Sequence, residues 1–251
     1  MRKTSSYKSF IVTMIACISY LTSYSQFNKV SYSTQYWYQY YNQISLGEKW
    51  NITSDIGIRF KNNHTTINQA LLRIGAQYKI NKLILLGTGF ANFTSYKENK
   101  LTISEMRIWQ EISAKHIILK LQIHHRFRTE ERFFTDLPTK SKQKIVRLRY
   151  RLYCTYPLNH KTIENKTIYL IIGDEFFVNY FKANQSIQNT LQNRALAGFG
   201  FKLNDELNFT ATYVSQLAQR NKLTEWDEAT IIWIGINHTI NIKSKKIQQQ
   251  I

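Results

Sequence analysis

The sequence predicts an all-β fold, a single antiparallel transmembrane β-barrel of about twelve strands. In residues 116–133, and again in residues 144–157, apolar and charged side chains alternate with a period of two. Each stretch exceeds the roughly 9–11 residues that a tilted strand needs to cross a bilayer. The connections also alternate in length, as in barrels with short periplasmic turns and longer extracellular loops. A soluble antiparallel sheet also alternates, but it requires neither this strand length nor this order of loops.

In each of these two central strands the arginines fall on one face, which we assign to the lumen. The opposite, apolar face is assigned to lipid. In the first strand the apolar set is Leu119, Leu121, Ile123, His125 and Phe127, and the other set is Lys120, Gln122, His124, Arg126, Arg128, Glu130 and Arg132. In the second strand Val146, Leu148, Tyr150, Leu152, Cys154 and Tyr156 alternate with Arg147, Arg149, Arg151, Tyr153 and Thr155.

The first 25 residues have the features of a secretory signal peptide. A basic region with Arg2, Lys3 and Lys8 precedes an apolar core at residues 10–21, and small residues around Tyr24 suit cleavage before Gln26. We therefore expect residues 1–25 to be the signal and residues 26–251 to form one barrel domain in the bacterial outer membrane. Apolar runs of helix length are absent after the signal, so no transmembrane helix is predicted.

The charge balance is strongly basic. Loss of the three basic signal residues lowers the formal charge from +18 to +15, and only Cys154 of the two cysteines remains, so no internal disulfide is possible. Such charge can indicate nucleic-acid binding. Export and the position of many arginines within alternating strands favour a lumen or anionic lipid instead. The expected partners are outer-membrane lipid and lipopolysaccharide, with a small anionic solute as a further candidate.

In the first half of the mature chain, the remaining strands are predicted as follows. Residues 30–41 are crowded with aromatic side chains, as in the interfacial girdle of a barrel. Residues 50–60 and 72–79 alternate cleanly and predict amphipathic strands. Residues 83–94 carry Gly87 and Gly89 on one face, where we expect bulky inward neighbours to need room.

The later strands and the loops follow the same rules. Residues 102–113 place charged side chains opposite an apolar face, and alternation or apolar composition predicts further strands at 167–179, 194–203, 207–213 and 229–242. Short turns are expected near residues 46–48, 81–82, 114–115, 159–165 and 204–205, and long loops at 61–68, 96–100, 134–143, 182–192 and 218–228.

This division gives eleven strands, whereas bacterial single-chain barrels normally have an even number. If the last strand ends in the periplasm, the first of eleven strands would begin outside the cell. We therefore expect either a short additional strand within residues 26–32 or a wrongly assigned segment. The prediction is about twelve strands, with ten as the alternative.

Charged side chains on the inward faces form the candidate site. Arginine forks can hold carboxylates through two hydrogen bonds, so one interpretation is a salt-bridged network that fills a narrow barrel. The other interpretation is an anion-attracting constriction, because rings of arginine select anions in pores. The predicted lumen network consists of Glu105, Arg107, Arg126, Arg128, Glu130, Arg132, Arg147, Arg149, Arg151, Glu175 and Arg194.

The leading interpretation is an outer-membrane barrel that acts as a narrow pore or as a structural membrane component. Two other functional classes are alternatives to it. An enzyme acting on lipid or lipopolysaccharide would require His124 or His125 beside a nucleophilic serine, but the chain has no Gly-x-Ser-x-Gly motif. A surface binding module would use the loops at 134–143, 182–192 and 218–228. No catalytic residue, metal ligand set or cofactor fingerprint is predicted.

Several motifs resemble, in order, those of the domain-of-unknown-function family 2490. They are the six residues from Glu105 to Gln110, the run from His125 to Arg132, the run from Arg147 to Leu152, the five residues from Glu175 to Asn179, and Gln192-Asn193-Arg194. The resemblance spans nearly the whole mature chain. It implies a bacterial outer-membrane β-barrel, and it brings no established activity or catalytic residues.

Overall fold

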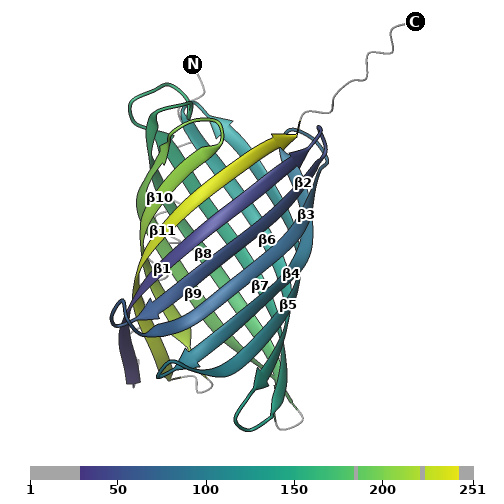
Figure 1. The fold of residues 1–251 in the computed structure, drawn as a ribbon, viewed down its shortest axis with the longest axis vertical. Helices are drawn as coiled ribbons and strands as arrows, with labels where there is room; N and C mark the ends of the chain where they lie inside the picture. The colour runs from purple at the N-terminus through teal and green to yellow at the C-terminus, as the bar shows by residue number, and fades with distance from the viewer. Residues whose placement is uncertain (1–28, 184–185, 221–223, 243–251) are drawn as a thin grey trace, which may run out of the picture.

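The computed structural model describes residues 29–183, 186–220 and 224–242, which form a closed barrel of eleven strands (Figure 1). The strands are β1 (Lys29–Leu46), β2 (Trp50–Lys61), β3 (Ile67–Lys79), β4 (Ile84–Lys97), β5 (Lys100–Ile118), β6 (Leu121–Asp136), β7 (Lys142–Pro157), β8 (Thr167–Ala183), β9 (Ser186–Lys202), β10 (Leu207–Gln219) and β11 (Glu225–Ile242). No helix in these ranges is long and apolar enough to cross a membrane. The predicted signal, residues 1–25, lies outside the described residues.

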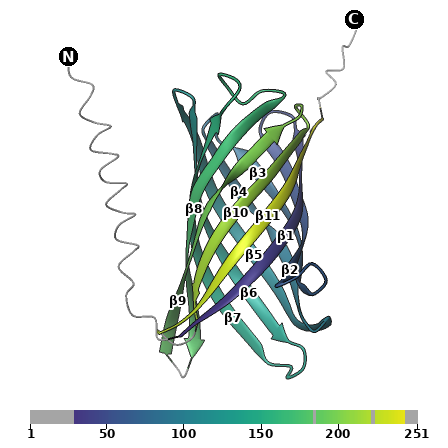
Figure 2. The ribbon, with the colours of Figure 1, turned by 90° about the vertical axis from the view of Figure 1, so that its left-hand side faces the viewer.

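The barrel closes through a parallel pair of strands. All other neighbouring strands are antiparallel and consecutive in sequence, whereas β1 pairs in parallel with β11 from Lys29 opposite Glu225 to Leu46 opposite Ile242. The two strands lie side by side in both ribbon views (Figures 1 and 2). Because consecutive strands reverse direction, an odd number of them brings the first and last strands together with the same direction. Lys29 and Ile242 therefore lie at opposite ends of the barrel.

The strand count differs from the prediction of about twelve, and from the alternative of ten. The described residues form eleven strands, and the eleven segments assigned from the alternation all correspond to observed strands. Because β1 hydrogen-bonds directly to both β2 and β11, the described sheet has no free edge at which an additional strand would pair. The expectation of an even number came from the usual strand parity of bacterial barrels, which this closure does not follow.

The strands are longer than their sequence patterns indicated, so the expected difference between short turns and long loops is largely absent. Within the described residues, connections at one end span 62–66, 98–99 and 137–141, and those at the other end span 47–49, 80–83, 119–120, 158–166 and 203–206. The turn expected at 114–115 lies at 119–120, because β5 and β6 remain paired to Ile118 opposite Leu121. Polar residues assigned to loops still form ladder hydrogen bonds within the extended hairpins.

Apolar side chains cover the outside of the barrel. Exposed residues on the outer face include Leu72, Phe90, Met106, Ile172 and Phe199. Larger aromatic residues are also exposed near the two ends, with Trp50 and Tyr156 at one end and Tyr32, Phe133 and Tyr180 at the other. The alternation that predicted an apolar outer face and a charged inner face is thus present in the folded chain.

Glycines make room for Trp109 on the inner wall, as the position of Gly89 predicted. Gly89 pairs with Gly75 on β3 and with Trp109 on β5. A Cβ atom at Gly89 would lie 2.6 Å from the Trp109 ring and 2.6 Å from the Gly75 Cα. Trp109 is 4% exposed, so it packs directly over the two glycines. Gly87 gives similar room to Glu111, which would lie 3.0 Å from an added Cβ.

We expect Gly89→Ala to lower the free energy of unfolding by about 1–3 kcal/mol, because the new methyl group overpacks a rigid contact. The measurement is the denaturant concentration at which the refolded barrel unfolds. Gly87→Ala is the matched control on the same face of the same strand. A Cβ at Gly87 would come no closer than 3.0 Å to its nearest neighbour, whereas one at Gly89 would clash with the backbone carbonyl oxygen of Ile74, so the effect at Gly87 should be smaller. Equal destabilisation by both substitutions would contradict this account of Gly89.

Candidate functional site

All eleven residues of the predicted lumen network lie in the barrel interior, where they are buried or half-buried. They come from five neighbouring strands, β5 to β9, and the inward alternation of those strands brings them together. Asp55 and Arg59 of β2, Arg73 of β3 and Glu111 of β5 face the same interior. The interior therefore gathers more arginines than carboxylates.

Glu130 and Glu175 are the carboxylates with the most arginines within 4 Å, four and three respectively. Both are 2% exposed. Glu130 accepts a hydrogen bond of 2.8 Å from Arg149 Nη1 and lies 3.4 Å from Arg107 Nη1. Glu175 accepts hydrogen bonds from Arg149 Nε at 2.7 Å and from Arg126 Nη2 at 2.9 Å. Arg149 thus joins the two carboxylates, and such charge-assisted bonds are the strong ones in a dry interior.

Two further carboxylates extend this network along the barrel. Glu105 accepts hydrogen bonds of 2.5 Å from both Arg107 Nε and Arg132 Nε. Glu111 accepts bonds of 2.9 Å and 2.6 Å from Nε and Nη2 of Arg128. Each buried carboxylate therefore has guanidinium partners, which is what permits ionised groups to be buried.

Aromatic rings of β1, β4 and β8 complete the network. The Arg59 guanidinium lies 3.9 Å from the Trp37 ring centroid and 5.7 Å from that of Phe93. The Arg194 guanidinium likewise lies between two rings, 5.0 Å from the Trp37 ring centroid and 4.7 Å from that of Phe177. A guanidinium within about 6 Å of a ring centroid is attracted by the ring's electron-rich face.

These contacts form a closed circuit around the interior, which we call the interior ring. Each member contacts the next, and the last contacts the first: Trp37, Arg59, Phe93, Arg107, Glu130, Arg149, Glu175 and Arg194. The link between Arg194 on β9 and Trp37 on β1 joins strands that are not neighbours.

At the level of the interior ring the lumen is filled. Trp37 and Phe93 are 2% exposed, and the adjoining Phe177 is 0% exposed. On the wall behind Trp37, the side chains of Val214 and Ile231 are also fully buried. An eleven-stranded barrel is wider than the eight-stranded barrels that ordinary side chains just fill, and long arginines and large aromatic rings occupy the extra width.

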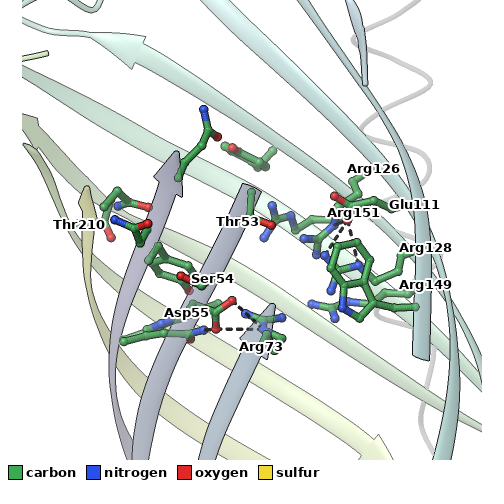
Figure 3. A pocket seen from close by; sticks show the side chains of 18 of the residues that line it. Thr53, Ser54, Asp55, Arg73, Glu111, Arg126, Arg128, Arg149, Arg151 and Thr210 are labelled. Carbon is green, nitrogen blue, oxygen red and sulfur yellow. Dashed lines mark hydrogen bonds and ion pairs between the residues drawn. The ribbon is translucent and has the colours of Figure 1, made fainter. Parts of the chain in front are cut away.

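A cavity of about 460 Å³ lies between the interior ring and the end of the barrel where β11 terminates. Figure 3 shows part of its lining, with Arg126 and Arg151 on one side and Thr53 and Thr210 on the other. Nine arginines and two carboxylates line this cavity: Arg59, Arg73, Arg107, Arg126, Arg128, Arg147, Arg149, Arg151, Arg194, Asp55 and Glu111. We call it the arginine cavity.

The interior on the other side of the ring is different. A second cavity there, of about 610 Å³, is lined by uncharged polar residues such as Ser31, Ser33 and Gln216, together with Lys61 and the ion-paired Arg220 and Asp227. The interior ring therefore lies between two cavities of unlike composition. Only the arginine cavity carries a large excess of positive charge.

The two histidines considered for catalysis have other contacts. His124 stacks on Tyr153, with ring centroids 4.5 Å apart. His125 lies on the outer face, where its Nδ1 is 2.8 Å from the Tyr150 hydroxyl. Within the described ranges neither imidazole is hydrogen-bonded to a serine. Those ranges also contain no group of three His, Cys, Asp or Glu side chains placed to hold a metal ion.

The predicted network omitted several residues that the structure adds. Asp55 and Arg59 lay on the polar face of a strand that was predicted correctly, so the period-two pattern could have identified them. Trp37 and Phe177 give no signal by residue type, because an aromatic residue suits either face of a barrel strand. Their alternation with Gln35 and Gln39, and with Glu175 and Asn179, could however have placed them inward.

Comparisons with known proteins identify a family but no individual related protein. A family model described as "Protein of unknown function (DUF2490)" matches residues 34–227. No curated protein matches the chain. No solved structure matches it either.

Proposed function

The chain belongs to the DUF2490 family, and from its barrel and charged interior we propose that it is a bacterial outer-membrane protein whose narrow lumen attracts small anions. The single observation that carries this proposal is the arginine cavity, inside a barrel with an apolar exterior. Nine arginines line it, against two carboxylates in the lining and three more, Glu105, Glu130 and Glu175, that pair with those arginines.

The outer surface suits a lipid environment. Strands of 12 to 19 residues exceed the roughly 9–11 residues needed to cross a bilayer, and their outer faces expose side chains such as Ile56, Leu72 and Ile172. A closed barrel also satisfies the backbone hydrogen bonds that lipid cannot satisfy. The exposed aromatic residues near both ends correspond to interfacial girdles. Outer-membrane lipid and lipopolysaccharide are accordingly the proposed surroundings.

The interior suits anions. Rings of arginine raise the local concentration of anions and select them in narrow pores. The arginine excess is concentrated in one cavity, so an anion entering the barrel from that end meets positive charge before it meets the interior ring. We propose that transport through the barrel is limited by this ring.

The burial of the interior ring favours a second candidate, a structural membrane component that does not conduct. Glu130, Glu175 and Phe177 have almost no exposed surface, so this level has no water-filled path in the structure described. In that case the arginines serve to fill and stabilise the barrel. The two candidates share the membrane location and differ in conductance.

We expect the purified protein to migrate differently on a denaturing gel with and without boiling, and to show small, anion-selective conductance in planar bilayers. The reversal potential in a potassium chloride gradient gives the selectivity. Preference for potassium would overturn the anion-attracting lumen. A folded, inserted barrel without conductance would favour the structural component, and recovery as a soluble protein without a boiling-dependent shift would overturn the membrane location.

A further inference from the structure

The arginine cavity has two chemically different walls. Arg126 and Arg128 of β6 and Arg149 and Arg151 of β7 occupy one wall, and the opposite wall belongs to β10, β11, β1 and β2, which are contiguous in the sheet. Besides the charged Asp55 and Arg59 of β2, that wall presents neutral groups able to form hydrogen bonds: Tyr41, Gln43, Thr53, Thr210, Thr212, Asn237 and Thr239. Figure 3 shows Thr53 and Thr210 across the cavity from Arg126 and Arg151.

The arginine wall contains positive charge that the protein does not neutralise. Arg126 pairs directly with Arg151 across β6 and β7, and like charges placed opposite each other destabilise a sheet. The nearby Glu175 bonds to Arg126 and Arg149 and lies 3.7 Å from Arg194. Arg151 lies opposite Glu175 in the register of β7 and β8, but among the described residues no ion pair within 4 Å joins it to a carboxylate, and its guanidinium lies 4.8 Å from the Tyr153 ring centroid.

Both members of this arginine pair also have an unsatisfied donor. The Nε atoms of Arg126 and Arg151 are buried and have no hydrogen-bond partner in the structure described. Burying a donor without a partner is unfavourable, and more so when the donor is charged. An oxyanion between the two guanidinium groups would accept these hydrogen bonds and offset their mutual repulsion.

The neutral groups of the opposite wall suit an uncharged, hydrogen-bonding part of the solute. Tyr41 is half-buried and lines the cavity, and none of the hydrogen bonds described involves its hydroxyl. Threonine hydroxyls and the Asn237 amide surround the same space. These groups both donate and accept hydrogen bonds, which matches the hydroxyl groups of a sugar, whereas a bare halide can only accept them.

From these two walls we infer that the arginine cavity binds a small hydroxylated oxyanion, a sugar acid or a sugar phosphate. The oxyanion lies between Arg126 and Arg151, and the hydroxyl groups face Tyr41 and the threonines of β2 and β10. The cavity volume of about 460 Å³ falls in the range of roughly 300–1,000 Å³ typical of small-molecule sites. This inference rests on the proposed anion-attracting lumen and names the solute class for it.

The test is calorimetric titration of the purified barrel with four probes: glucuronate, glucose 6-phosphate, inorganic phosphate and glucose. We expect the two anionic sugars to bind more tightly than either phosphate or glucose. Whichever of the two binds more tightly identifies the carboxylate or the phosphate as the preferred oxyanion, and both results support the inference.

Two substitutions test the contributions of the two walls to binding separately. Arg151→Gln removes no ion pair and is expected to weaken the anionic sugars by roughly tenfold or more, since a hydrogen bond to a charged group contributes about 1.5–3 kcal/mol. Tyr41→Phe should weaken the sugars but leave inorganic phosphate unchanged. Lys144→Gln makes the same change of charge at an exposed site and should leave all four probes unchanged.

The results show whether the solute class or the proposed anion-attracting lumen is wrong. If inorganic phosphate binds as tightly as the anionic sugars and Tyr41→Phe has no effect, the solute class is wrong while the anion-attracting lumen stands. If no anion binds and the bilayer shows no anion preference, the proposed function itself fails. A boiling-dependent gel shift for each variant shows that the barrel is folded.

Discussion

Replacing Glu130 with glutamine is expected to lower the free energy of unfolding by about 3–5 kcal/mol, because it leaves buried guanidinium groups without their counter-charge. Glu130 is 2% exposed and lies within 4 Å of four arginines. Glutamine keeps the shape of the side chain but supplies a neutral oxygen and an amide that repels the donors around it. The loss is electrostatic, with little contribution from packing.

The neighbouring Glu131→Gln is the matched control for this prediction. Glu131 lies on the outer face, its side chain is 44% exposed, and its Oε2 pairs with Lys144 Nζ at 2.7 Å. Exposed ion pairs contribute about 0–1 kcal/mol. Denaturant titration of both refolded variants gives the comparison. If the two substitutions have similar effects, the interior network does not stabilise the barrel in the way we describe.

The period-two alternation made much of this molecule predictable. It identified the eleven segments that became strands, the apolar outer face and the inward arginines, because each depends only on which side of a strand a residue occupies. Arg147 and Glu175, for example, are far apart in sequence and were assigned to one interior from alternation alone.

Other features depend on which strands meet, and the alternation within one strand does not contain that information. The parallel pairing of β1 with β11 is a property of the closed sheet, so the strand number was predicted wrongly from the usual parity of such barrels. The turn at Leu119 and Lys120 was displaced because pairing continued beyond the apparent end of the pattern. The contact between Arg194 and Trp37 crosses the lumen, and no local pattern predicts it.

The interior ring also leads to a prediction about conductance. Replacing Phe177 with alanine is expected to increase the conductance of the barrel, because the fully buried ring lies against Arg147, Arg149 and Arg194 at 4.7 to 5.3 Å from their guanidinium carbons. Its removal leaves a void at the filled level, beside polar groups that water can hydrate. Truncating a buried phenylalanine also costs about 3–5 kcal/mol, so the stability of the variant should fall.

Single-channel recordings of the wild type, Phe177→Ala and Phe176→Ala separate the effect of the lumen from that of the outer wall. Phe176 is the adjacent residue, is 40% exposed and faces outward, so its truncation should leave conductance unchanged. A boiling-dependent gel shift must first show that both variants are folded. Larger anion currents in Phe177→Ala alone would locate the constriction at the interior ring. Equal conductance in all three proteins would mean that passage is limited elsewhere, because a wider ring would then have no effect on the current.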